Sequence, residues 1–124
     1  MRTAQRVLLI GFDPAVVDYS KWPGLTPEKL YAAFDADLAS FAEAGFGAQY
    51  CLVDLGATAE ESVRKTLAAQ AFDVVLIGAG VRTSVEHFLV FEKLVNVVHR
   101  HAGQARICFN TGPVDSVAAV RRWV

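Results

Sequence analysis

This 124-residue sequence has no large excess of positive or negative charge, no recognisable signal segment and no long apolar run. Its 12 Lys and Arg residues nearly balance 13 Asp and Glu residues, so the net charge is −1. No basic field is present to attract a phosphate backbone, and nucleic acid is not an expected partner. No apolar run approaches the roughly 20 residues of a membrane span, and the N-terminal run is too short for a signal peptide. We therefore expect a cytoplasmic protein that has no membrane partner.

Metal-binding and redox patterns are missing as well. The two cysteines, Cys51 and Cys108, each lie in an apolar run and form no Cys-x-x-Cys pair, which is typical of small core residues in a reducing compartment. All three histidines fall on one expected helix, where His99 and His101 are two residues apart and therefore lie on different faces. We expect neither a disulfide nor a metal site.

Nucleotide-binding and catalytic motifs are also missing. No G-x-G-x-x-G follows the first apolar strand, so an ordinary NAD site is not expected. The sequence has no P-loop and no G-x-S-x-G nucleophile elbow. It therefore names no reaction and no cofactor, and it leaves open whether the protein is an enzyme.

What the sequence does contain is a regular alternation of apolar strands and helical patterns, which fits a single domain over residues 1–124. The expected strands are 6–12, 48–54, 73–78 and 105–110, and the expected helices are about 27–44, 58–70, 85–102 and 114 to the end. Thr26 and Pro27 suit a helix start, and Thr58 and Thr83 each open a predicted capping box. This alternation predicts a parallel sheet that is covered by helices on both faces.

The strand patterns also predict an order. Segments "VLLI" and "VVLI" of the first and third strands are continuously apolar, as strands buried on both faces should be. Gln49 interrupts the second strand and the fourth alternates, so these two are expected at the edges, in the order 2-1-3-4. The result is a three-layer α/β/α sandwich. It resembles the flavodoxin-like, Rossmann-like and receiver-like folds with one β-α unit fewer, but Gly78 stands where a receiver would carry its phosphoryl-accepting aspartate.

A ligand site is expected where the strand order reverses, outside the carboxyl ends of strands 1 and 3. The loop after strand 1, residues 13–25, is thirteen residues long, whereas such loops usually have about 2 to 6. It carries Asp13, Tyr19 and Trp22. The loop is either a lid over the site or only packing. Asp13 is either the N-cap of a short helix or a functional carboxylate, and it is the one candidate acid or base.

The segment "GAGVRTS" after strand 3 supplies the other half of the expected site. Gly80 allows close approach of the backbone, and Arg82 and Thr83 precede a helix whose first amides favour an anion. The alternative is a tight turn in which Thr83 caps the helix and Arg82 is solvated. Asn110 and Thr111 end the neighbouring strand and can reach the same crevice. We expect an anionic metabolite there.

The helix expected over 85–102 predicts a homodimer. Its core stripe is read as Val85, Phe88, Phe91, Leu94 or Val95, and Val98. Apolar residues also fall outside that stripe, namely Leu89, Val90 and Val97. A helix with apolar residues on more than one face is usually buried on more than one face. The alternative function is therefore a non-catalytic module that dimerises or binds a partner.

Overall fold

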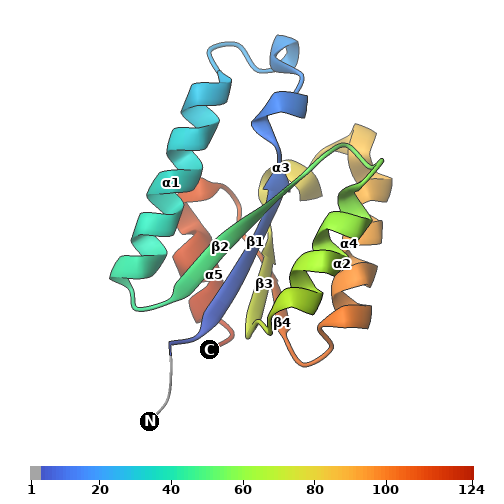
Figure 1. Cartoon of the computed structure of the whole chain (residues 1–124). Coiled ribbons are helices and arrows are strands. Elements are labelled where there is room, and N and C mark those ends of the chain that lie inside the picture. The colour runs from blue at the N-terminus through green and yellow to red at the C-terminus, as the bar shows by residue number, and fades with distance from the viewer. Residues whose placement is uncertain (1–3) are drawn as a thin grey trace.

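The computed structural model describes residues 4–124, and its elements follow the expected alternation (Figure 1). The strands are β1 (Arg6–Phe12), β2 (Gly47–Val53), β3 (Val74–Ile77) and β4 (Arg106–Phe109). The α-helices are α1 (Pro27–Glu43), α2 (Ala59–Ala69), α3 (Ala79–Arg82), α4 (Phe88–His101) and α5 (Ser116–Arg121). Short 3₁₀ turns are η1 (Pro14–Val16), η2 (Tyr19–Lys21), η3 (Val85–His87) and η4 (Pro113–Asp115).

The four strands form one parallel sheet in the order β2-β1-β3-β4, which confirms the predicted order. In the register, Leu8 of β1 lies between Gln49 of β2 and Val75 of β3, and Val75 faces Ile107 of β4. Every residue of β3 is buried, whereas β2 and β4 are partly exposed, as the apolar patterns predicted. The chain is thus a flavodoxin-like sandwich with one β-α unit fewer.

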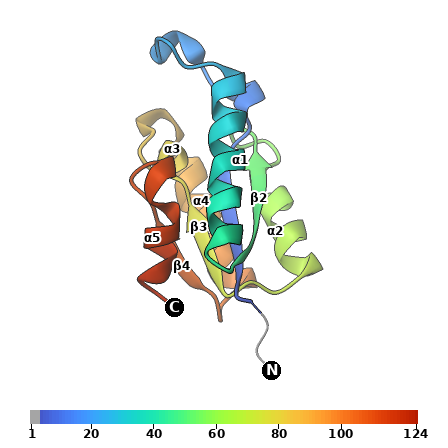
Figure 2. The same ribbon diagram turned by 90° about the vertical axis from the view of Figure 1, so that its left-hand side faces the viewer.

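Two helical layers cover the sheet, because alternate strand residues face opposite sides. Leu8 and Ile10 belong to the core beneath α2 and α4, and Val7 and Leu9 belong to the core beneath α1 and α5. Figure 2 shows α1 and α5 together on one face, with α2 beyond the sheet. Phe41 of α1 is fully buried in the second core, and its ring meets the ring of Phe46 at 5.7 Å between centroids.

The third helix differs from its prediction. The segment expected as one helix over 85–102 is divided into η3 and α4, the expected loop before it contains the short helix α3, and the capping box expected at Thr83 does not form. The Thr83 hydroxyl instead donates to the carbonyl oxygen of Ala79, at 2.7 Å. Leu94 and Val98 are fully buried on α4, as expected. Val85 and Phe88, expected in the core, are 90% and 56% exposed, while Val90, expected outside the core, is buried.

The expected cap at Thr26 forms, whereas the capping box expected at Thr58 does not. Thr26 caps α1 as expected, and its hydroxyl accepts from the backbone amide of Lys29 at 3.2 Å. Thr58 makes no capping bond to α2. Its hydroxyl donates to Asp54 Oδ2 at 2.6 Å, and Asp54 also accepts from the backbone amide of Gly56. Asp54 therefore closes the turn after β2, and hydrogen bonds from Thr58 and Gly56 lower its pKa.

The two cysteines lie on opposite edge strands, as expected. Cys51 of β2 and Cys108 of β4 are both buried and free. Burial raises the pKa of Cys108 to about 11 and also raises that of Cys51, so neither thiol is activated. In the part of the chain that the structure describes, no helix combines the length and apolarity needed to cross a bilayer.

Candidate functional site

The carboxyl ends of β1 and β3 lie side by side, as the site prediction requires. The backbone amide of Gly78, directly after β3, donates to the carbonyl oxygen of Ile10 at 2.9 Å. The loop from Asp13 to Thr26 extends beyond this edge of the sheet in both views, and α3 lies beside the end of β1 (Figures 1 and 2). The two segments expected to form the site therefore share one edge.

Asp13 and Tyr19 hold the long loop in shape. Asp13 Oδ1 accepts from the backbone amide of Ala15 at 2.9 Å, so Asp13 is the N-cap of η1. The same oxygen accepts from the hydroxyl of Tyr31 at 3.4 Å. The Tyr19 hydroxyl donates to the carbonyl oxygen of Pro14 at 2.6 Å. The capping interpretation of Asp13 is therefore confirmed, and both side chains have structural tasks.

Two contacts tie this loop to the segment that precedes α4. Lys21 of η2 forms an ion pair with Glu86 of η3. The ring of Phe12, at the end of β1, meets the ring of His87 edge-on at 5.3 Å between centroids. Trp22 follows Lys21 and is 61% exposed, so its ring is not packed into the fold. The loop after β1 thus reaches the start of α4 and leaves an exposed aromatic ring near that bridge.

Asn110 joins the end of β4 to the α3 turn. Its Oδ1 accepts from the backbone amide of Ala79 at 2.8 Å, and its carbonyl oxygen accepts from Arg82 Nη2 at 2.9 Å. Asn110 is only 5% exposed. Asn110 therefore holds the turn that carries Gly80 and Arg82 through these two hydrogen bonds. The structure thus brings these three predicted residues together.

The expected cradle of helix amides does not form at this turn. The α3 helix has four residues, and the amides of Val81 and Arg82 both donate to the carbonyl oxygen of Gly78. The amide of Ala79 is taken by Asn110. The long helix whose dipole was expected to favour an anion starts only at Phe88, beyond η3. A β-carbon added to Gly80 would meet no atom within 4 Å, so the turn borders open space.

Arg82 is the one cationic residue of the predicted site, and no ion pair among the described residues neutralises its charge. Its side chain is half-buried, and its guanidinium lies 6.0 Å from the centre of the Phe109 ring. Its Nε is buried and has no hydrogen-bond partner, and no carboxylate within residues 4–124 forms an ion pair with it. A buried donor without a partner costs about 1–3 kcal/mol, and more when charged. Such a group calls for an acceptor.

The threonines of the predicted site are occupied. The Thr111 hydroxyl donates to Asp115 Oδ2 at 2.8 Å, and the Thr111 amide also donates to Asp115. The Thr83 hydroxyl bonds to the backbone, as described above. No hydrogen bond or ion pair within residues 4–124 links Asp13 or Tyr19 to Arg82. The candidate site is therefore narrower than predicted and centres on Arg82.

Asp37 is a buried polar residue that the sequence interpretation missed. It lies in the middle of α1, is 4% exposed, and accepts hydrogen bonds from Tyr50 and Ser116. Burial raises its pKa, although those two hydrogen bonds oppose the rise. The available signal was its spacing, because Asp37 stands three residues after Phe34 and four before Phe41, so the three side chains share one face of the helix.

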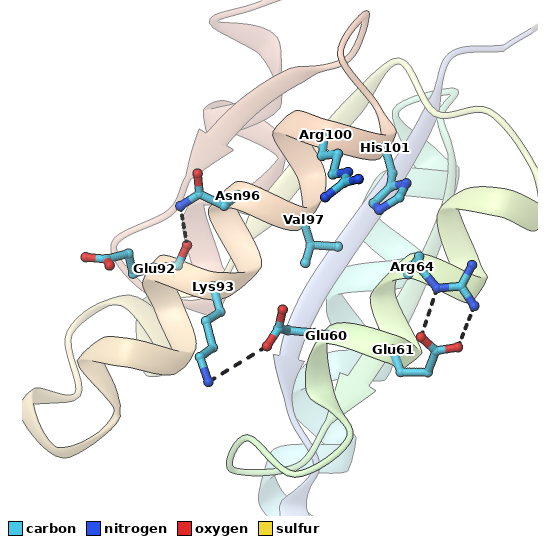
Figure 3. Close-up of a pocket in the computed structure, with 9 residues that line it drawn as sticks. All are labelled: Glu60, Glu61, Arg64, Glu92, Lys93, Asn96, Val97, Arg100 and His101. Carbon is cyan, nitrogen blue, oxygen red and sulfur yellow. Dashed lines mark hydrogen bonds and ion pairs between the residues drawn. The ribbon is translucent and has the colours of Figure 1, made fainter.

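A groove of about 350 Å³ lies elsewhere, between α2 and α4 (Figure 3). Arg64 of α2 pairs with Glu61, and Lys93 of α4 lies 3.8 Å from Glu60. Arg100 and His101 project from the end of α4 on the same side (Figure 3). Most of these charges already have partners of opposite sign, which is typical of a solvated surface. No cluster of three or more residues suited to a metal ion occurs between residues 4 and 124.

The fold and this edge of the sheet define the chain as a flavodoxin-like α/β domain. Comparison with protein-family models and with curated proteins gives no match. Any function is therefore inferred from the side chains of the candidate site.

Proposed function

We propose that this domain binds a small anionic metabolite, carrying a carboxylate or phosphate, at the carboxyl ends of β1 and β3, with Arg82 as its anchor. The supporting observation is the Arg82 guanidinium, whose buried Nε has no partner and whose charge is not compensated. Its turn follows β3, one of the two strands whose carboxyl ends flank the reversal of strand order. We propose binding and no reaction, because the Asp13 carboxylate is already the cap of η1.

The chemistry of the anchor favours an oxyanion. A guanidinium presents planar pairs of donors that match carboxylate and phosphate oxygens. The carbonyl oxygen of Asn110 accepts from Arg82 Nη2 and so fixes one end of the guanidinium. The centre of the Phe109 ring lies 6.0 Å from the guanidinium carbon. The remaining donors include the free Nε, and open space beside Gly80 leaves room for the ligand.

Replacing Arg82 with alanine is expected to weaken binding of the anion by about 10- to 150-fold, because hydrogen bonds to charged groups contribute about 1.5–3 kcal/mol. A thermal-shift screen against phosphates, sugar phosphates and organic acids identifies the ligand. At 100 times its dissociation constant, a ligand adds about 2.7 kcal/mol of stability. Calorimetry on both proteins then measures the difference.

Arg64→Ala is the matched control, because Arg64 is an exposed arginine of the other groove and pairs with Glu61 through Nε at 2.8 Å. It should bind the ligand as well as the wild type does. Equal binding by Arg82→Ala and the wild type would overturn the proposal, as would a screen in which no anion stabilises the protein.

A second candidate function, a module that dimerises or binds a partner, is favoured by the exposed apolar side chains. Val85, Phe88 and Leu89 are 90%, 56% and 63% exposed at the start of α4. Exposed apolar groups that gather on one side often mark an interface. We propose a homodimer through the first turns of α4.

In this dimer, Leu89→Glu places a charge in the contact and is expected to convert the protein to a single-chain mass. Light scattering at tens of micromolar measures the mass. Val114→Glu is the control, since Val114 is 99% exposed on η4 and lies outside the proposed contact. A single-chain mass for the wild type, or an unchanged dimer in Leu89→Glu, would exclude this interface.

A further inference from the structure

A chain of hydrogen bonds runs through the protein from α1 to the α3 turn. Tyr50 and Ser116 both donate to Asp37 Oδ2, at 2.9 Å and 2.7 Å. Asn110 Nδ2 donates to the hydroxyl oxygen of Ser116 at 2.9 Å. The backbone amide of Ala79 donates to Asn110 Oδ1 at 2.8 Å. From Ala79 to Asp37, every donor therefore points in the same direction, toward the carboxyl group.

The chain is buried along most of its length. Asp37, Ser116 and Asn110 are 4%, 0% and 5% exposed. Buried polar groups are tolerated only when they are hydrogen-bonded, and bonds in such a chain polarise one another. No cationic residue within residues 4–124 forms an ion pair with Asp37. Burial consequently raises the pKa of this carboxyl, and the negative charge of Asp115 adds to the rise.

Asp37 can change its protonation state without breaking the chain. Its hydrogen bonds within residues 4–124 both end at Oδ2, so Oδ1 is the oxygen that can take a proton. Asp37 also lines a groove of about 590 Å³ between α1 and the η4–α5 segment, which gives the proton a route to solvent. The titratable or charged groups around Asp37 are Tyr50 of β2, Asp115 of η4, Glu43 of α1 and Arg121 of α5.

We propose that Asp37 is a positioning residue for the Arg82 site, acting through Ser116 and Asn110, and that its ionisation is transmitted along this chain to the α3 turn. An ionised carboxyl accepts shorter and stronger hydrogen bonds than a neutral one. Ionisation therefore tightens the Ser116 bond first, then the Asn110 bond, and finally the bond from the Ala79 amide. Asn110 also holds Arg82 Nη2 through its carbonyl oxygen, so the same residue sets the turn and the guanidinium.

The transmission is measured by NMR without any ligand. The ¹³C signal of the Asp37 carboxyl reports its titration, and the Ala79 amide proton is expected to move downfield with the same midpoint as the pH rises. Ser116→Ala keeps the carboxyl but removes the link, so the Ala79 signal should no longer follow Asp37. The proposal would be overturned if the chemical shift of the Ala79 amide did not change with pH in the wild type. It would also be overturned if that shift followed the titration of Asp37 equally well in Ser116→Ala.

The positioning role rests on the proposed anion site and is measured with the anion identified in the screen, or with inorganic phosphate. Asp37→Asn keeps an accepting oxygen but, like a neutral carboxyl, accepts weaker hydrogen bonds, so it should bind more weakly than the wild type and more tightly than Asp37→Ala. Asp37→Ala removes the acceptor and should bind about tenfold more weakly, with its fold checked by NMR. Removal of a negative charge alone would strengthen binding in both variants, and that result would refute positioning. If no anion binds while the Ala79 signal follows Asp37, the proposed function fails and the transmission stands.

The sign of the stability change gives an independent check. A carboxyl whose pKa is raised by folding favours the folded state fully below its unfolded pKa, and loses that contribution as pH rises through the folded pKa. The wild type should therefore lose stability relative to Asp37→Asn as pH rises above the ordinary value of 3.8. A difference that is constant with pH would show that folding does not raise the pKa of Asp37.

Discussion

Phe41→Ala is expected to lower the free energy of unfolding by about 3–5 kcal/mol, a large part of the 5–15 kcal/mol that stabilises a typical domain. Phe41 of α1 is fully buried between that helix and the sheet, and its ring packs edge-on against Phe46. Alanine would lose the transfer free energy of the ring and leave a cavity that close-packed neighbours fill only in part. Urea denaturation followed by circular dichroism measures the change.

Trp22→Ala is the control that also removes an aromatic ring, because Trp22 is 61% exposed in the loop after β1. It should cost less than about 1 kcal/mol, as substitutions away from the core usually do. Equal losses in the two variants would contradict the assignment of Phe41 to the core and of Trp22 to the surface.

Asn110→Ala is expected to cost about 1.5–4.5 kcal/mol, although Asn110 lies at the end of an edge strand. Its side chain accepts from the part-buried Ala79 amide and donates to the buried Ser116 hydroxyl. Alanine leaves the Ala79 amide without its acceptor, which costs about 1–3 kcal/mol, and removes the bond to Ser116, which contributes about 0.5–1.5 kcal/mol. The same denaturation measurement reports the loss, and hydrogen exchange at Ala79 should accelerate.

Asn96→Ala is the matched control for this prediction. Asn96 is exposed on α4, and its side chain donates only to the carbonyl oxygen of Glu92, at 2.9 Å. Its loss should change stability by no more than about 0.5 kcal/mol. If Asn110→Ala were as mild as Asn96→Ala, the buried chain from Ala79 to Asp37 would not be a stabilising feature.

The architecture could be predicted from the sequence because burial on both faces leaves a direct pattern. The continuous apolar runs of β1 and β3 placed them at the centre, and Gln49 marked β2 as an edge. The third helix could not be predicted as well. Thr83 and Glu86 have the spacing of a capping box, but the chain uses Thr83 to close a separate turn. Local propensity does not reveal such a break, because the bonds that select it include the long-range one from Ala79 to Asn110.

The edge of the sheet that carries the candidate site was predictable, whereas the arrangement of its side chains was less so. The reversal of strand order located the edge, and Arg82 and Asn110 do meet there. The sequence could not show that Asn110 is buried behind the turn, since this follows from bonds to Ala79 and to Ser116. Asp37 was missed because its role depends on partners that are distant in the sequence, and only its helical spacing pointed inward.

Binding of an anion at Arg82 can be followed residue by residue in an ¹H–¹⁵N NMR titration with inorganic phosphate and with the anions found in the screen. We expect saturable shifts at the Arg82 Nε–H signal and at the amides of residues 79–83, all lost in Arg82→Ala. Shifts confined to Arg64, Arg100 and His101 in the groove between α2 and α4, or no saturable shift at all, would show that Arg82 binds no anion.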